Sequence, residues 1–299
     1  MKIAVLVTVH NRADVTVKGL TQLGKLSREL SEEFVFYIYL VDDGSTDGTS
    51  ARVRELPLNI SLTNGSGTLY WNRGMVLAYK AAQRQGAKFD AYMLYNDDIY
   101  LSEKFGDFLR HFREHNKDIL VGAFLEPSTG DISYSGYLRT SKLRPTSFAK
   151  PGLTGLRVPI DTFNGNLVLV PAAVFERLDG LDPKFTHAYG DIDLGLRAKD
   201  LGVNSFIFGI PVGLCERGPH LDQRIRSSTL RNRVQLLFGF PHGPASHLRF
   251  VKKHGVTVLF PVYVVADLVK RIRKLFWTRT GQLTQFFIQR ANVMQNFKA

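Results

Sequence analysis

The stretch AYMLYNDDIYL, residues 91–101, places two adjacent carboxylates at the end of an apolar run. Ala91–Tyr95 has the length and apolar character of a strand buried on both faces, and Asn96, Asp97 and Asp98 follow it directly. Neighbouring carboxylates repel each other unless a positive charge lies against them. The pattern therefore indicates either a capped turn, in which Asp and Asn are common, or a site that binds a cation.

Three further strands are expected before this one, with helices between them. The expected strands are Ile3–Val9, Phe34–Val41 and Leu58–Leu62, and the expected helices cover Val17–Leu26, Gly48–Leu56 and Trp71–Gln85. This alternation predicts an α/β fold with a mostly parallel, twisted sheet wound with helices.

Polar clusters follow three of these strands, at the edge where ligands bind in parallel sheets. The clusters are His10-Asn11-Arg12, Asp42-Asp43 and Asp97-Asp98. Mg²⁺ and Mn²⁺ prefer oxygen ligands, and Mg²⁺ takes only one or two protein carboxylates together with water and substrate phosphates. The sequence thus predicts a metal–diphosphate site in which Asp42 or Asp43 accepts hydrogen bonds from a base or ribose. Neither a G-x-G-x-x-G fingerprint nor a phosphate-binding loop follows the first strand.

The second half of the chain has a looser pattern. Strands are expected over Ile119–Leu125, Ser133–Leu138, Leu167–Val170 and Val203–Phe208, and helices over Ala172–Arg177 and Ile192–Leu201. Residues 139–157 are basic and rich in Pro and Gly, and they predict a surface loop.

Composition limits the setting in which the protein works. Its 299 residues contain one cysteine, Cys215, which excludes an internal disulfide and favours a reducing compartment. The net charge of +12 calls for an acidic partner. The N-terminus lacks the features of a signal peptide. We expect a cytoplasmic protein.

The last fifty residues are markedly basic and contain an apolar segment. Val256–Val269 is too short to span a bilayer and contains Pro261 and Asp267, and the sequence KRIRK follows it. It is either a segment lying on an anionic membrane surface, at the inner face of the cell membrane, or a buried helix with a solvated basic end. Basic residues with few interleaved aromatics give no nucleic-acid recognition motif, so nucleic acid is not an expected partner.

Five motifs in order resemble the family 2 inverting glycosyltransferases of the GT-A fold, over about residues 1–215. They are VLVTVHNR, VDDGSTDGT, NGSGTLYWNRGM, LYNDD and YGDIDLGLRAKDLG. Within that family the chain is most similar to bacterial enzymes that build surface polysaccharides, rhamnosyltransferase-like ones among them. The resemblance implies a GT-A domain over residues 1–225, with a nucleotide-binding half (1–100) and an acceptor half (101–225), and a helical extension over 226–299.

The resemblance also implies a donor site. Thr8, His10, Asn11 and Arg12 would line the nucleotide pocket, Asp43 or Asp42 would contact the base, and Arg73 would meet the nucleotide or its diphosphate. Asp98 matches the metal-binding acid, and Asp97 would support it. Asn96 stands where many relatives have an acid. His220 is a candidate further metal ligand, with an ordinary loop histidine as the alternative.

The catalytic base of the family matches Asp191 in GDIDLGLR, with Gly190 in place of the usual glutamate and Asp193 as a supporting acid. The alternative for Asp191 is a simple helix cap. Asn164 and Gly165 would lie beneath the donor sugar, where glycine lets the backbone approach closely.

The implied reaction moves a sugar from a nucleoside-diphosphate sugar to a hydroxyl of a glycan or lipid-linked acceptor, with Mg²⁺ or Mn²⁺ as cofactor. One alternative is a sugar-1-phosphate nucleotidyltransferase, which would want a glycine-rich basic signature where this chain has VHNRADVT. Another is an inactive membrane-associated assembly partner, and the intact Asp98 and Asp191 count against it.

Overall fold

Strands and helices largely alternate from Lys2 to Leu125 in the computed structural model, which describes residues 1–218 and 221–276. The strands are β1 Lys2–Val9, β2 Val35–Asp42, β3 Ile60–Asn64, β4 Ala91–Tyr95, β5 Tyr100–Leu101, β6 Ile119–Leu125, β7 Ile132–Tyr134, β8 Gly136–Arg139, β9 Phe148–Ala149, β10 Arg157–Ile160, β11 Thr162–Phe163, β12 Leu167–Pro171 and β13 Ser205–Leu214. The helices are α1 Ala13–Glu29, α2 Thr49–Arg54, α3 Tyr70–Arg84, α4 Lys104–Glu114, α5 Ala172–Arg177, α6 Gly190–Asp200, α7 Leu221–Ser227, α8 Leu230–Phe238, α9 Pro244–His254 and α10 Phe260–Leu275, with a 3₁₀ turn at Thr257–Leu259.

Ten strands form one central sheet, in the order β10-β13-β6-β12-β4-β1-β2-β3 with β5 and β7 added at β13 and β6. Strands β1 to β4, β6 and β13 point the same way, whereas β12 and β10 run against their neighbours. Val9 pairs with Asp42, and Leu6 pairs with Leu94, so the polar residues after β1, β2 and β4 reach the same edge. The predicted α/β class and mainly parallel sheet are confirmed.

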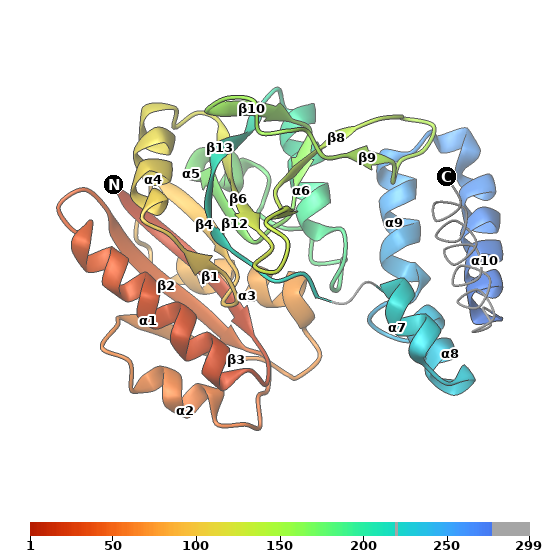
Figure 1. Cartoon of the computed structure of the whole chain (residues 1–299), viewed down its shortest axis with the longest axis horizontal. Coiled ribbons are helices and arrows are strands. Elements are labelled where there is room, and N and C mark those ends of the chain that lie inside the picture. The colour runs from red at the N-terminus through yellow and green to blue at the C-terminus, as the bar shows by residue number, and fades with distance from the viewer. Residues whose placement is uncertain (219–220, 277–299) are drawn as a thin grey trace, which may run out of the picture.

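Helices cover both faces of this sheet (Figure 1). Phenylalanines of α4 and leucines of α1 pack on one face with Val5 and Val7 of β1. On the other face, Met75 and Tyr79 of α3 pack with Leu6 of the same strand. Because successive side chains of a strand point to opposite faces, burial on both faces produces the unbroken apolar runs in the sequence.

The structure corrects several expected bounds. The third strand begins at Ile60, two residues later than expected, and β13 continues past Phe208 to Leu214. The single strand expected over Ser133–Leu138 is two strands in different sheets, because β7 pairs with β6 while β8 pairs with β11 and β9. The surface loop expected over residues 139–157 contains β9, which ties its middle to β8.

The C-terminal helices α7 to α10 stand together beside α6 and β8 (Figure 1). Phe250 of α9 is fully buried and packs with Phe185 and Leu196 of the α/β domain. Arg249 binds Asp182, and Lys253 and His254 bind Asp193 at 2.7 and 2.8 Å. The extension is therefore anchored to the helix that begins beside Asp191, and the domain boundary at residue 225 stays a prediction.

Helix α10 is not the buried helix that the sequence allowed as an alternative. Val262 and Val265 are 59% and 60% exposed. Within the described part of the chain, no helix is both long enough and apolar enough to cross a membrane.

Candidate active site

A pocket of about 350 Å³ opens at the carboxyl edge of β1, β2 and β4. It is lined by Thr8, Val9, His10, Arg12, Asp43, Tyr70, Trp71, Asn96, Asp98 and His187. The structure therefore brings Asp43 and Asp98 together, although 55 positions separate them along the chain.

The loops after β1 and β2 are fastened to each other on one side of this pocket. His10 donates from Nδ1 to the Asp43 carbonyl over 2.7 Å, which leaves Nε2 to accept from the Asn11 amide at 3.1 Å. Asn11, at a φ of +48°, accepts the Thr46 backbone N–H through Oδ1 over 2.7 Å. Asn tolerates this left-handed conformation better than most residues. Asn11 thus connects the two loops and holds His10 in place, and it does not line the pocket.

The two acids after β2 have different positions. Asp42 accepts from the Ser45 N–H and the Ser50 hydroxyl, and it does not line the pocket. Asp43 lines the pocket and accepts the backbone N–H groups of Gly67, Leu69 and Tyr70 over 2.8, 2.8 and 2.9 Å. A carboxylate has about four acceptor positions, so Asp43 keeps one for a ligand.

Arg12 lies between the two acids that follow β4. Its guanidinium donates to Asp97 at 3.1 Å and to Asp98 at 3.0 Å. Asp97 is buried and also accepts from the Thr16 hydroxyl over 2.5 Å. Burial raises the pKa of Asp97 even though Arg12 and Thr16 oppose the shift. Part of the positive charge that the acid pair requires is therefore supplied by the chain itself.

The oxygens around Asp98 fit a divalent cation. Asp98 Oδ1 is buried and has no hydrogen-bond partner among the described residues. Asn96 Oδ1 already accepts from the Trp71 indole N–H at 2.8 Å, and both Asp97 oxygens are engaged. A single protein carboxylate oxygen suits Mg²⁺-like ions, which take their other ligands from water and phosphates. His220, the other predicted ligand, lies outside the described residues.

Asp191 lies in the first turn of α6, behind the pocket wall. Its carboxylate accepts the N–H groups of Gly165 and Ile192 over 2.9 and 2.8 Å. Burial raises the pKa of Asp191, although these hydrogen bonds act against the shift. A Cβ at Gly165 would lie 2.4 Å from the Trp71 ring and 3.4 Å from Asp191 Cβ, so Gly165 connects Asp191 to a pocket-lining side chain.

The substitution of glycine for the usual glutamate at position 190 has a steric reason. A Cβ there would lie 1.7 Å from Asn72 Oδ1. The Asn72 amide is fixed because it donates to the carbonyls of Asp182 and Phe185, each over 2.9 Å. Only glycine fits at this position unless Asn72 moves.

Other predicted residues lie away from the pocket lining. Arg73 donates to the Pro183 carbonyl at 3.3 Å and lies over the Phe240 ring, and Asn164 accepts the Tyr137 hydroxyl at 2.6 Å. Asp193, for which the resemblance implied a supporting role, forms ion pairs with Arg197 and with Lys253 of α9. The pocket contact expected of Arg73 has no support in this geometry, and Tyr70 from the same motif lines the pocket instead.

Val9, Tyr70, Trp71 and His187 line the pocket but were not among the residues predicted for the site. Tyr70 and Trp71 belong to the quoted motif NGSGTLYWNRGM, and two adjacent aromatics at the start of a helix were a signal that could have found them. Tyr70 also contacts Phe240 of the C-terminal extension, with ring centroids 5.1 Å apart. That contact had no sequence signal.

Residues 4–173, more than half of the chain, match the family described as Glycosyl transferase family 2. The chain belongs to this family. The predicted family, its GT-A fold and glycosyltransferase activity are thereby confirmed. A search among curated proteins finds no match.

Three solved structures illustrate the likeness in fold. A mannosyltransferase from Pyrobaculum calidifontis, in complex with GDP-Man and Mn²⁺, is 14% identical at a TM-score of 0.52, covering 91% of this chain and 72% of its own. S. aureus TarS, residues 1–349 with UDP-GlcNAc, is 15% identical at a TM-score of 0.53, and the match covers 92% of this chain and 82% of the TarS chain. GalNAc-T7 with UDP, GalNAc and Mn²⁺ is 12% identical at a TM-score of 0.52, and the match covers 90% of this chain and 57% of the GalNAc-T7 chain. At these identities the likeness establishes the fold alone.

Proposed function

We propose that this glycosyltransferase transfers a sugar, with inversion, from a nucleoside-diphosphate sugar to a hydroxyl of a glycan or lipid-linked acceptor in bacterial polysaccharide synthesis. The observation that carries the proposal is the shared pocket of Asp43 and Asp98, with Asp191 linked to its wall through Gly165 and Trp71. The ligands of two solved relatives, GDP-Man and UDP-GlcNAc, support a nucleotide-sugar donor.

The nucleotide would enter between the loops after β1 and β2. The remaining acceptor position of Asp43 suits an N–H of a base or a ribose hydroxyl, while Thr8 and His10 form the neighbouring wall. Tyr70 and His187 line the same pocket and are the aromatic rings against which the base would pack. The donor's phosphates would then lie toward Arg12 and Asp98.

Asp98 Oδ1 is the atom that would hold Mg²⁺ or Mn²⁺, and the Mn²⁺ in two solved relatives supports a cation of this kind. When bound, the cation would neutralise the charge that develops on the departing diphosphate. Arg12 fixes the orientation of Asp98 through its other oxygen. It also places a permanent positive charge at the pocket.

Asp191 would take the proton from the acceptor hydroxyl. The acceptor oxygen forms a bond to the anomeric carbon while the bond from that carbon to the diphosphate oxygen breaks on the opposite face. The proton passes to a free acceptor position of the Asp191 carboxylate, since each of its oxygens already accepts one backbone N–H. The raised pKa of Asp191 makes it a stronger base than an ordinary exposed aspartate.

One experiment separates this function from the alternatives. The purified protein is incubated with a panel of nucleoside-diphosphate sugars and Mg²⁺ or Mn²⁺, and the released products are identified. From these donors a glycosyltransferase releases nucleoside diphosphate. A nucleotidyltransferase releases pyrophosphate only from a nucleoside triphosphate and a sugar 1-phosphate, which a parallel incubation supplies. Asp191→Asn should lower the rate of transfer by about 10² to 10⁴ while the donor still binds. Wild-type turnover in this variant would refute the assigned base, and the absence of turnover in the wild type with every donor would favour an inactive assembly partner.

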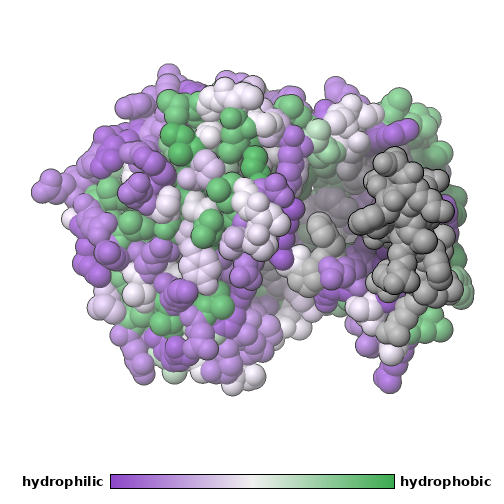
Figure 2. Space-filling view, in the orientation of Figure 1, coloured by the Kyte–Doolittle hydropathy of each residue, from purple (hydrophilic) through white to green (hydrophobic). Residues whose placement is uncertain are grey.

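The acceptor side of the proposal includes an anionic membrane surface on the cytoplasmic side. Apolar side chains recur along α10 and the turn before it at helical spacing, and all of them are exposed: Val258, Val262, Val265, Leu268, Val269, Ile272 and Phe276. Figure 2 shows hydrophobic surface at the outer margin of the C-terminal helices. The exposed cations Lys270 and Arg273 lie among these positions. Basic residues near an anionic membrane contribute about 1 kcal/mol each to binding, and the apolar stripe would enter the interface.

Vesicle sedimentation tests this surface on the full chain. The double variant Val265→Asn/Val269→Asn should lose binding to vesicles that contain anionic lipid, because its apolar stripe is interrupted in the middle. Leu156→Asn is a matched control, since Leu156 is similarly exposed at 53% but belongs to the α/β domain. Equal binding by both proteins would refute the membrane assignment.

A further inference from the structure

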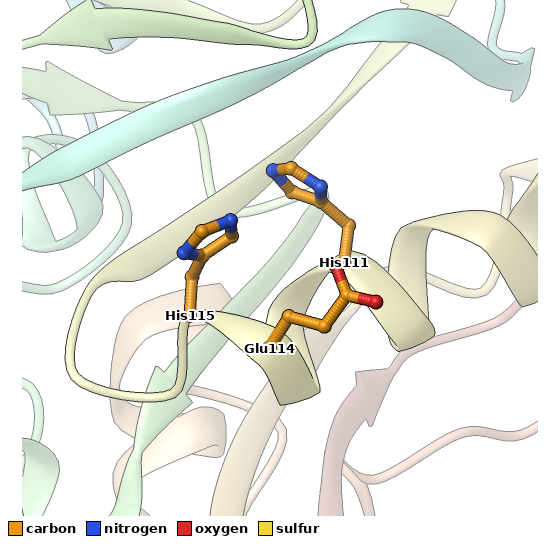
Figure 3. A group of neighbouring side chains, drawn as sticks. All are labelled: His111, Glu114 and His115. Carbon is orange, nitrogen blue, oxygen red and sulfur yellow. The ribbon is translucent and has the colours of Figure 1, made fainter.

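Two histidines and a glutamate occupy the last turn of α4 and the residue after it. His111, Glu114 and His115 each offer a ligand atom, and these atoms lie within 4.8 Å of one another. In Figure 3 the two imidazole rings stand on the same side of the helix, and the Glu114 side chain extends from the same turn. Among the residues that the structure describes, this is the one such group of three histidine, cysteine or carboxylate side chains.

The site is separate from the donor pocket. Helix α4 leaves the carboxyl edge of the sheet after Asp98 and β5 and runs back toward the amino-terminal end of β6, which begins at Ile119. Because β6 is parallel to β4, the end of α4 lies at the edge of the sheet opposite Asp98. An ion at the end of α4 would therefore not be the ion that contacts the donor's diphosphate.

His111 supplies an independent observation. Its Nε2 is buried and makes no hydrogen bond with any described residue, while its ring packs 5.5 Å from that of Phe208 in β13. An unpartnered buried polar atom costs free energy, and a metal ion is one partner that a neutral imidazole can bind.

The surrounding charges do not prevent the binding of a cation. Arg157 of β10, which pairs with Phe208 across the sheet, forms an ion pair with Asp118 and stacks over Phe206. Glu114 is exposed and forms no ion pair in the described structure. Its carboxylate can therefore bring a negative charge to an ion held by the two rings.

We propose that His111, Glu114 and His115 form a binding site for Zn²⁺ or a similar late first-row divalent cation, at the edge of the sheet opposite the donor pocket. Histidines at positions i and i+4 of a helix are a recurrent zinc-binding spacing, and here a carboxylate at i+3 completes three ligands. Ligand atoms around a tetrahedral Zn²⁺ with bonds of about 2.0 to 2.2 Å lie roughly 3.3 Å apart. The ligand atoms, now within 4.8 Å of one another, would have to approach by about 1.5 Å or less to reach this separation. The exposed Glu114 side chain can approach by rotating. The fourth position is left for water.

Ligand type distinguishes this ion from the one proposed at Asp98. Imidazole nitrogens favour Zn²⁺, Ni²⁺ or Cu²⁺, whereas the single carboxylate at Asp98 with substrate phosphates favours Mg²⁺ or Mn²⁺. The proposal therefore goes beyond the transferase function and stands even if that function is wrong. An ion at the end of α4 would join its last turn to the residue that follows the helix, and so stabilise the turn that leads into β6.

The test uses the full chain without a histidine tag, stripped of metal with a chelator and titrated with Zn²⁺ by calorimetry. We expect one Zn²⁺ per chain and a higher midpoint of thermal unfolding when Zn²⁺ is present. Co²⁺ used as a probe should give the visible absorption bands of a tetrahedral site. His111→Gln, Glu114→Gln and His115→Gln should each weaken Zn²⁺ binding at least tenfold, and the double histidine variant should abolish it.

Controls separate this site from the rest of the chain. His242→Gln removes a histidine from the C-terminal extension and should leave Zn²⁺ affinity unchanged. Circular dichroism without metal establishes that each variant is folded. A wild-type chain that binds no Zn²⁺ would overturn the proposal. Full Zn²⁺ affinity in the double histidine variant would also overturn it, because the ion would then lie at another site such as Asp98.

Discussion

Replacement of Asp193 by asparagine should destabilise the protein by an amount that depends on pH. Asp193 is fully buried in α6 and accepts from Arg197 at 2.7 Å, while Lys253 and His254 of α9 bind its other oxygen. Burial opposes ionisation, but the His254 hydrogen bond and the charges of Arg197 and Lys253 prevail and lower the pKa of Asp193 from 3.8 to about 2. Asparagine keeps the shape of the side chain and removes its charge.

The magnitude follows from this shift. At 1.36 kcal/mol for each pKa unit, ionised Asp193 contributes roughly 2 kcal/mol to the free energy of unfolding at pH 7. Because the folded pKa lies below the unfolded one, this contribution is complete above about pH 4 and is lost as the pH falls through about 2. By pH 3 about half of it remains. Asp193→Asn should therefore be less stable than the wild type by ~2 kcal/mol at pH 7 and by about half as much at pH 3.

Urea unfolding at the two pH values measures this difference through the midpoint, with an unchanged m-value indicating that the unfolding reaction is the same. Asp107→Asn is the control, because the ion pair of Asp107 with Lys104 on α4 is largely exposed and should contribute less than 1 kcal/mol. The argument would be refuted if the loss of unfolding free energy in Asp193→Asn were the same at pH 7 and pH 3, or if it were no larger than the loss in Asp107→Asn. In that case the contacts between α6 and α9 would not depend on the charge of Asp193.

Three further predictions concern the pocket. Arg12→Met should destabilise the protein by about 3 kcal/mol, because it leaves Asp97 buried without its cation, and should raise the KM for the donor. Arg12→Lys should recover part of the lost stability and lower the KM again. A KM that Arg12→Met leaves unchanged would show that Arg12 does not belong to the donor site. Gly165→Ala should reduce kcat tenfold or more, since its Cβ would lie 2.4 Å from Trp71, whereas Gly155→Ala meets no atom within 4 Å and should be neutral in the same assay. The pH profile of kcat/KM should fall on the acidic side with a pKa above 3.8, because burial raises the pKa of Asp191 and only its ionised form accepts a proton; an acidic limb at or below 3.8 would contradict this role.

Local pattern was sufficient for two buried strands and one short helix. Ala91–Tyr95, Ile119–Leu125 and Ala172–Arg177 have the bounds that the sequence predicted. The helix α4 was not predicted, although Phe105, Phe108, Leu109 and Phe112 recur at helical spacing and form its buried face. The short strands β5 and β9 could not be predicted, because two residues carry no periodicity and their conformation depends on the partner strand.

For the candidate site too, the sequence predicted some features and the structure alone revealed others. The motifs located the acids at the strand ends, but Asp42 and Asp43 are adjacent and chemically identical, and only the fold turns Asp43 toward the pocket. The sequence likewise suggested a metal ion between Asp97 and Asp98, whereas the structure places Arg12 there and leaves a single oxygen of Asp98 unpartnered. Contacts between residues 85 and 86 positions apart are set by how the loops pack rather than by any local pattern.

The sequence by itself determined the parallel arrangement of the first strands and the edge at which their polar residues gather, because hydrophobic periodicity and strand ends are local properties of the chain. Tertiary structure alone decided which oxygen stays free for a ligand and which acid is held by neighbouring cations. It also decided that α9 packs on the helix carrying Asp191 while α10 keeps an exposed apolar face. These outcomes depend on distances between segments far apart in the chain, and burial, hydrogen bonding and charge pairing act through those distances.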